Sequence, residues 1–96
     1  MKSRNEIIAA IRAVLVRHPY VRRAALFGSC ARDEAGEGSD VDLLVAFGPD
    51  RPRGLALYRL DSELEQALGR RVDVVQEHLL HPRIRPYVAG EAIPIL

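Results

Sequence analysis

The chain has 96 residues, of which 48% are hydrophobic and 28% are charged, and its formal net charge is +1. This length allows one small domain with a hydrophobic core, and the composition is that of a globular protein and not of a disordered chain. A charge so close to zero provides no strong general attraction to nucleic acid or to a membrane surface. We therefore expect a single domain spanning residues 1–96.

The chain contains one cysteine, Cys30, which excludes an internal disulfide and is typical of a reducing, cytoplasmic setting. The N-terminal segment lacks a signal-peptide core, and no apolar run is long enough to span a bilayer. We interpret Cys30 as a small packing residue and not as a nucleophile. The arginines that come in pairs are interpreted as solvated ends of elements; they are Arg22, Arg23, Arg51, Arg53, Arg70, Arg71, Arg83 and Arg85.

The N-terminal third is predicted to form a helix and then a strand. Ser3-Arg4-Asn5-Glu6 has the S-x-x-E pattern of a capping box, and apolar residues then recur every three or four positions up to about Arg17. His18-Pro19 should end the helix, because the residue before a proline avoids helical geometry. Val21–Phe27 is predicted to be the first strand, with a nearly continuous buried run in its last four residues.

The middle of the chain alternates short loops with regular elements. After the break at Gly28-Ser29, a helical turn is predicted at Cys30–Asp33 and a loop at 34–39. Asp40–Phe47 is predicted to be the second strand. Because side chains alternate along a strand, its two aspartates share one face.

The C-terminal half is predicted to contain two helices and two strands. Apolar spacing indicates a helix over about Leu55–Leu68 that ends at a glycine, and a strand over Arg71–Gln76 follows. A short helix is expected around residues 84–88. Ala92–Leu96 should be an edge strand, because Pro94 cannot donate a hydrogen bond to a neighbour. The expected fold is therefore α/β (α+β), with a small mixed sheet of three to four strands flanked by helices.

Two motifs and one further aspartate carry the candidate chemistry. Gly28-Ser29 is a turn of small residues, whose backbone N–H groups can approach a phosphate. Asp40 and Asp42 place two carboxylates at the start of a strand, although aspartates are also common there for structural reasons. Asp73 interrupts an apolar strand, where a carboxylate is costly unless it is paired, solvated or metal-bound. If the second and third strands are neighbours, the three carboxylates converge and suit magnesium.

These segments resemble the nucleotidyltransferase superfamily that includes DNA polymerase beta, and the likeness is closest to its minimal members, the MNT domain proteins. Gly28–Arg32 is similar to the GS-x-AR segment of those proteins, Ser39–Val45 to their SD-x-DLLV segment, and Leu68–Val75 to the segment with the third acid. The resemblance extends from about Val21 to the end of the chain. Asp33 departs from the pattern, because many relatives carry glycine there.

The resemblance implies a polymerase beta-like fold and magnesium-dependent nucleotidyl transfer. Gly28-Ser29 would hold the β- and γ-phosphates of ATP, and Arg32 would balance their charge. Asp40 and Asp42 would bind two magnesium ions. Asp73 would ligate the ion beside the acceptor hydroxyl and help to deprotonate that hydroxyl.

The acceptor is expected on another protein, because a chain of this length leaves little room for a substrate-binding domain. Minimal members of the family act as antitoxins of HEPN-domain ribonuclease toxins, and some transfer AMP to a tyrosine of the toxin. The resemblance therefore implies a protein adenylyltransferase antitoxin. Two alternatives stay open: a catalytically silent antitoxin that acts by binding alone, and transfer to a small molecule or nucleic acid. Nucleic acid is the less favoured acceptor, given the low net charge and the lack of an aromatic stacking platform.

Overall fold

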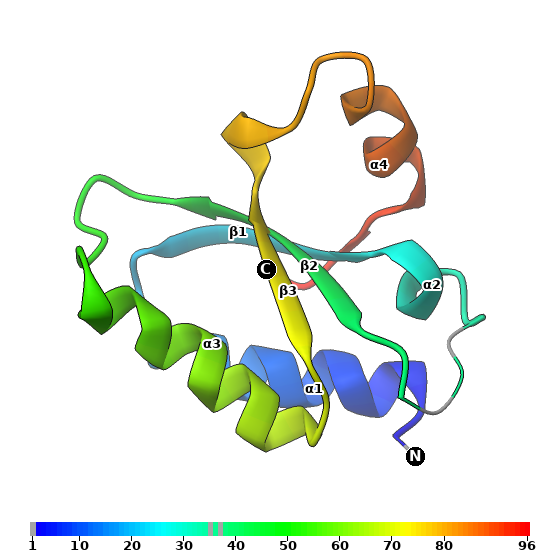
Figure 1. Ribbon diagram of the computed structural model, residues 1–96, viewed down its shortest axis with the longest axis horizontal. Coiled ribbons are helices and arrows are strands. Elements are labelled where there is room, and N and C mark those ends of the chain that lie inside the picture. Colours follow the sequence, from blue (N-terminus) through cyan, green and yellow to red (C-terminus); the bar gives the residue numbers. More distant parts are fainter. Residues whose placement is uncertain (1, 35, 37) are drawn as a thin grey trace.

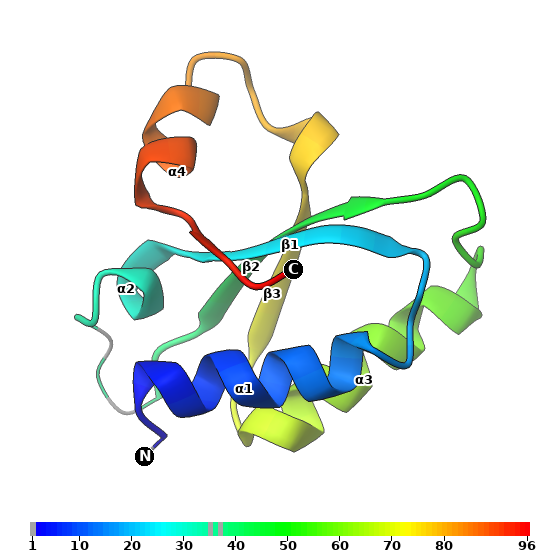
Figure 2. The same ribbon diagram turned by 180° about the vertical axis from the view of Figure 1, so that it is seen from behind.

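The computed structural model describes residues 2–34, 36 and 38–96. Its elements in chain order are α1 (Arg4–Leu15), β1 (Val21–Phe27), α2 (Gly28–Ala31), β2 (Val41–Phe47), α3 (Leu55–Leu68), β3 (Val72–Gln76), the short 3-10 helix η1 (Glu77–Leu79), α4 (Arg85–Glu91) and β4 (Ile93–Pro94). The strands form one mixed sheet in the order β3-β2-β1-β4. Helices α1 and α3 lie together against one side of this sheet, whereas α4 lies on the other side (Figures 1 and 2). The predicted α/β fold with a small mixed sheet is confirmed.

Local sequence signals explain where the two long helices begin and end. The Ser3 hydroxyl accepts a hydrogen bond from the Glu6 N–H at 3.2 Å, and the Glu6 carboxylate accepts one from the Ser3 N–H at 3.2 Å, so the predicted capping box is confirmed. Helix α1 ends at Leu15, slightly before the predicted Arg17. Helix α3 has the predicted bounds, and Gly69 closes it with a φ of 64°, a left-handed conformation that favours glycine.

The core lies between the sheet and the two long helices. Its fully buried side chains include Ile11 and Leu15 of α1, Leu60 and Leu64 of α3, and Leu43 of β2. Along β2 the residues alternate between buried and half-buried, as the period of a strand requires.

The predicted continuous buried run at the end of β1 is wrong. Ala24 and Leu26 are buried, whereas Ala25 and Phe27 are only half-buried. The reason is that α1 and α3 cover a single face of the sheet (Figures 1 and 2). The opposite face, which carries every second residue of β1 and β2, is therefore left accessible for a site.

Strand register determines which residues meet on that accessible face. Strands β1 and β2 are antiparallel and pair Phe27 with Asp42, so Gly28 follows directly after the residue opposite Asp42. Strands β2 and β3 are parallel, are linked through α3, and pair Asp42 with Asp73. The start of β2 is thus flanked by the end of β1 and the start of β3.

The remaining elements differ from the predictions mainly at their ends. Helix α2 begins at Gly28 and not at Cys30, and the terminal strand is reduced to Ile93–Pro94. The terminal strand does lie at the edge of the sheet, as Pro94 predicts. None of the helices in the described part of the chain combines the length and apolar character needed to cross a membrane.

Candidate active site

Gly28 lies directly against the carboxylate of Asp42. Its φ of +73° is in the left-handed region, and a Cβ built on it would collide with Oδ2 of Asp42 and lie 3.2 Å from its Cγ. Glycine is therefore required here for its conformation and for its lack of a side chain. The Gly-Ser turn and the second acid of the D-x-D motif form one structural unit.

The charges of two of the predicted acids, Asp40 and Asp73, act on the third, Asp42. Asp42 and Asp73 are register partners on neighbouring strands. Burial raises the pKa of the Asp42 carboxyl, and the charges of Asp73 and Asp40 raise it further, against a smaller opposing effect of Arg32. Asp40 and Asp73 are exposed. Among the described residues, no three His, Cys, Asp or Glu side chains stand close enough to hold a metal ion together.

The donor set nevertheless fits magnesium. Magnesium is usually bound by one or two carboxylates, with water and substrate phosphates as its other ligands. Asp42 and Asp73, which pair across neighbouring strands, could supply these carboxylates. Mutual repulsion of carboxylates, which contributes to the raised pKa of Asp42, is the condition that a divalent cation relieves.

Arg32 is tied to two glutamates. Its Nε donates to Glu34 and its Nη1 donates to Glu91 of α4, each at 3.0 Å. The hydrogen bond that Arg32 donates to Glu34 and the charge of Glu91 raise the pKa of Arg32, and its positive charge still lowers the pKa of Asp42. The guanidinium thus links the segment after the Gly-Ser turn (Gly28-Ser29) to α4, and contact with a triphosphate stays a prediction. The sequence contained no signal for the part played by Glu91.

Asp33 has the backbone conformation of a glycine. Its φ is 59°, in the left-handed region, and the adjacent Glu34 N–H donates to the Ser29 carbonyl at 2.9 Å. Aspartate tolerates this region better than most residues do. Asp33 therefore occupies a backbone position that would also suit glycine.

Arg70 supports the loop that leads into Asp40. Its Nε and Nη2 donate to the Ser39 carbonyl at 3.0 and 2.6 Å, and its Nη2 also donates to the Gly36 carbonyl at 3.2 Å. The residue is half-buried, and its Nη1 is fully buried. The interpretation of the paired arginines as solvated is therefore wrong for Arg70. No local pattern distinguishes it from its exposed neighbour Arg71.

Cys30 fastens the other side of the same segment. Its side chain is buried, and its thiol donates to the Asp40 carbonyl at 3.8 Å. Burial raises the pKa of the thiol, so it is less readily ionised than a free cysteine. The interpretation of Cys30 as a packing residue and not a nucleophile agrees with this environment.

Comparison with known proteins identifies the family. The family model described as nucleotidyltransferase domain matches residues 7–94. The chain belongs to this family. The MJ0435 protein of Methanocaldococcus jannaschii, provisionally named a protein adenylyltransferase, is 44% identical over 92 residues, 96% of this chain and 97% of that protein. The protein adenylyltransferase MntA of Thermococcus cleftensis is 42% identical over 89 residues, 93% and 89% of the two chains.

Solved structures agree with this assignment. A minimal nucleotidyltransferase superimposes with a TM-score of 0.75 and 48% identity, over 91% of this chain and 87% of that one. At lower identity the fold is shared with two antitoxin structures. One is a toxin–antitoxin with AMP-PNP, with a TM-score of 0.70, 24% identity and coverage of 99% and 73%. The other is the MNT antitoxin bound to a tri-AMPylated HEPN toxin of Shewanella oneidensis, with a TM-score of 0.60, 23% identity and coverage of 98% and 69%.

The contact between Gly28 and Asp42 can be tested with Gly28→Ala. The left-handed φ alone should lower the free energy of unfolding by about 1–2 kcal/mol, and displacement of the Asp42 carboxylate should abolish AMP-PNP binding in calorimetry. Gly90→Ala is the matched control, because nothing lies within 4 Å of the added methyl group. Equal nucleotide binding by wild type and Gly28→Ala would show that the contact between Gly28 and Asp42 is not needed to bind a nucleotide.

The repulsion at Asp42 predicts a pH-dependent stability. A folded-state pKa above the unfolded value means that ionisation of Asp42 disfavours the folded state, so the relative stability is highest at low pH and falls as pH rises through the folded pKa. Asp42→Asn should therefore be more stable than wild type near about pH 7, and the gap should close near about pH 3. Chemical unfolding across this range measures the difference. Asp50→Asn, in an exposed ion pair with Arg22, should not show such a gap.

The role of Arg70 can be tested with Arg70→Gln. Loss of its hydrogen bonds to the Ser39 and Gly36 carbonyls should cost about 1–3 kcal/mol and speed hydrogen exchange at the Asp40 and Val41 amides. Arg71→Gln, with an exposed side chain, should change neither quantity noticeably. Unchanged exchange in Arg70→Gln would show that the loop does not depend on the guanidinium.

Proposed function

We propose that this protein is a magnesium-dependent protein adenylyltransferase that moves AMP from ATP to a tyrosine hydroxyl of a HEPN-type toxin and thereby acts as its antitoxin. The observation that carries the proposal is the placement of Gly28 against Asp42, with Asp73 in register on the next strand. Similarity to the adenylyltransferase MntA of Thermococcus cleftensis and to the MJ0435 protein supports the reaction class. A cytoplasmic location is expected from the single, buried cysteine.

The nucleotide would bind at the end of β1. Backbone N–H groups of Gly28-Ser29 and the Ser29 hydroxyl would hold the β- and γ-phosphates. Arg32 would add a positive charge, exchanging one of its glutamate partners for a phosphate oxygen. Gly28 keeps this turn close to Asp42, so the α-phosphorus would lie over the start of β2.

The acids would bind metal and handle the acceptor proton. Asp40, Asp42 and Asp73 would hold two magnesium ions, which when bound neutralise charge on the transferring phosphoryl group. Asp73 lies on the strand farther from the Gly-Ser turn. It would therefore help to remove the proton of the acceptor hydroxyl, whose oxygen attacks the α-phosphorus in line while pyrophosphate leaves on the side of Gly28-Ser29.

The partner is inferred from relatives of the same fold. The similar structures include an MNT antitoxin in complex with a tri-AMPylated HEPN toxin, which is a property of that complex. The second candidate function is an antitoxin that acts by binding alone. Binding alone would leave the contact between Gly28 and the Asp42 carboxylate without a chemical role, and for that reason we rank this function second.

The reaction is tested by incubating the protein with magnesium, ATP labelled at the α-phosphate and the purified protein encoded beside it. We expect label on a tyrosine of the partner, and none when the label is on the γ-phosphate. Asp42→Ala should reduce transfer by a factor on the order of 100 or more. Asp50→Ala, which removes an acid of an exposed ion pair, should label the partner like wild type.

Equal labelling by wild type and Asp42→Ala would refute the catalytic role. A variant lacking all three acids separates the two candidates, because a pure binder would still neutralise the partner in a ribonuclease assay and an adenylyltransferase would not.

A further inference from the structure

A groove of about 380 Å³ lies between α3 and β3. We call it the β3-edge groove; its lining includes Phe47, Leu57, Tyr58, Asp61, Val74 and Gln76. Apolar surface continues from the exposed Tyr58 in its lining to Leu55 beside it, a residue that is 84% exposed. Neither the packing of the core nor the Gly28-Ser29 turn gives this groove a role.

Strand β3 is the outermost strand of the sheet, so one side of its backbone lacks a neighbouring strand. The Arg71 carbonyl accepts from the Val41 N–H at 2.9 Å and therefore points toward β2. Backbone groups alternate along a strand, so those of Val72 and Val74 point outward. The Val72 N–H is satisfied by the Glu65 carboxylate of α3 at 3.1 Å. The outward groups of Val74 lie beside the groove, where a further strand can pair with them.

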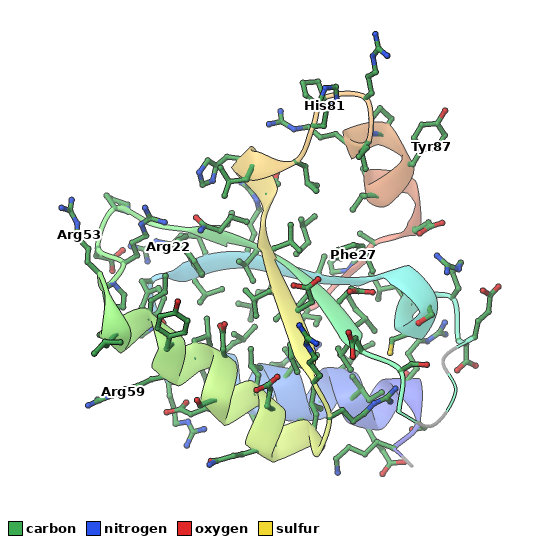
Figure 3. All side chains as sticks on the ribbon, in the orientation of Figure 1. Arg22, Phe27, Arg53, Arg59, His81 and Tyr87 are labelled. Atoms are coloured by element: carbon green, nitrogen blue, oxygen red, sulfur yellow. The ribbon has the colours of Figure 1, made fainter. Side chains whose placement is uncertain are left out.

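Asp61 places an unneutralised acid in the groove. It is half-buried, and none of the hydrogen bonds or ion pairs found among the described residues involves it. Burial raises the pKa of its carboxyl, and the charges of Glu65 and Asp73 raise it further. Arg53 and Arg59 point outward from the molecule (Figure 3). A lysine or arginine side chain would complement this carboxylate.

The position of the groove relative to the proposed reaction indicates its occupant. The Gly-Ser turn, Asp42 and Asp73 follow one another across β1, β2 and β3. If pyrophosphate leaves on the side of β1, in-line attack brings the acceptor from the side of β3. The β3-edge groove lies at the same edge of the sheet, but its residue Val74 faces the helix-covered side, whereas the neighbouring Asp73 faces the opposite side. A strand added at this edge presents alternate side chains to both sides. This step rests on the proposed function.

We propose that the β3-edge groove binds an extended segment of the acceptor protein. The segment pairs with the outward backbone of Val74, packs apolar side chains on Phe47 and Leu57, and places a lysine or arginine side chain on Asp61. The segment is thereby held along β3, and its intervening side chains, which point to the other face of the sheet, lie beside Asp73. The groove thus selects acceptors that carry an apolar and basic strand.

The proposal is tested by titrating the ¹⁵N-labelled protein, without ATP, with the peptide acetyl-Thr-Val-Tyr-Arg-Thr-Val-amide, whose two valines and arginine share one face of a strand and whose tyrosine lies on the other. We expect saturable shifts of the Val74 and Gln76 amides, and affinity about tenfold lower for the same peptide with glutamate in place of arginine. Asp61→Asn should lose about the same factor. Glu63→Gln, on the same helix but in contact with His18 of the α1–β1 connection, should bind like wild type.

Three outcomes would overturn the proposal: equal affinity for the two peptides, unchanged binding by Asp61→Asn, or no saturable shift at millimolar peptide. Shifts of the same amides on addition of AMP-PNP would assign the groove to the nucleotide and would also overturn it. Because ATP is absent from the titration, failure of adenylyl transfer with intact peptide binding counts against the proposed chemistry and not against the groove.

Discussion

The contact between Gly28 and the Asp42 carboxylate is the constraint on which the site depends. It joins the end of β1 to the start of β2 without any side chain between them, and it holds only while residue 28 has no Cβ and a left-handed backbone. Strand register then determines which acid lies beside Asp42, because the parallel alignment of β2 and β3 pairs it with Asp73. A shift of β2 by one residue would move Asp42 to the other face of the sheet, away from the Gly28-Ser29 turn and Asp73.

The site brings together negative charges that oppose folding, and its surroundings hold them in place. Repulsion from Asp73 and Asp40 adds to the burial cost of Asp42. Arg70 and Cys30 do not neutralise these acids; they fasten backbone carbonyls of Ser39 and Asp40 instead. Such an arrangement leaves a repulsion among carboxylates that a bound divalent cation would relieve.

Helix α3 serves the fold and the site together. Leu60 and Leu64 bury one of its faces against the sheet, and Glu65 satisfies a backbone N–H of the edge strand β3. One turn earlier, Asp61 lines the β3-edge groove, and its carboxylate has no such partner in the described part of the chain. Helix α3, which connects the parallel strands β2 and β3, thus also borders the groove at the β3 edge.

The sequence by itself predicted most of the elements and the family, because the signals for both are local. Periodic apolar residues, the capping box and Gly69 predicted α1 and α3, and short motifs predicted a nucleotidyltransferase domain with candidate site residues at Gly28, Ser29 and the three acids. Tertiary structure alone decided the rest. The half-burial of Ala25, the pairing of Arg32 with Glu91 and the buried Nη1 of Arg70 depend on neighbours far away in the chain. Sequence spacing can predict which face a side chain takes, but only packing decides what lies against that face.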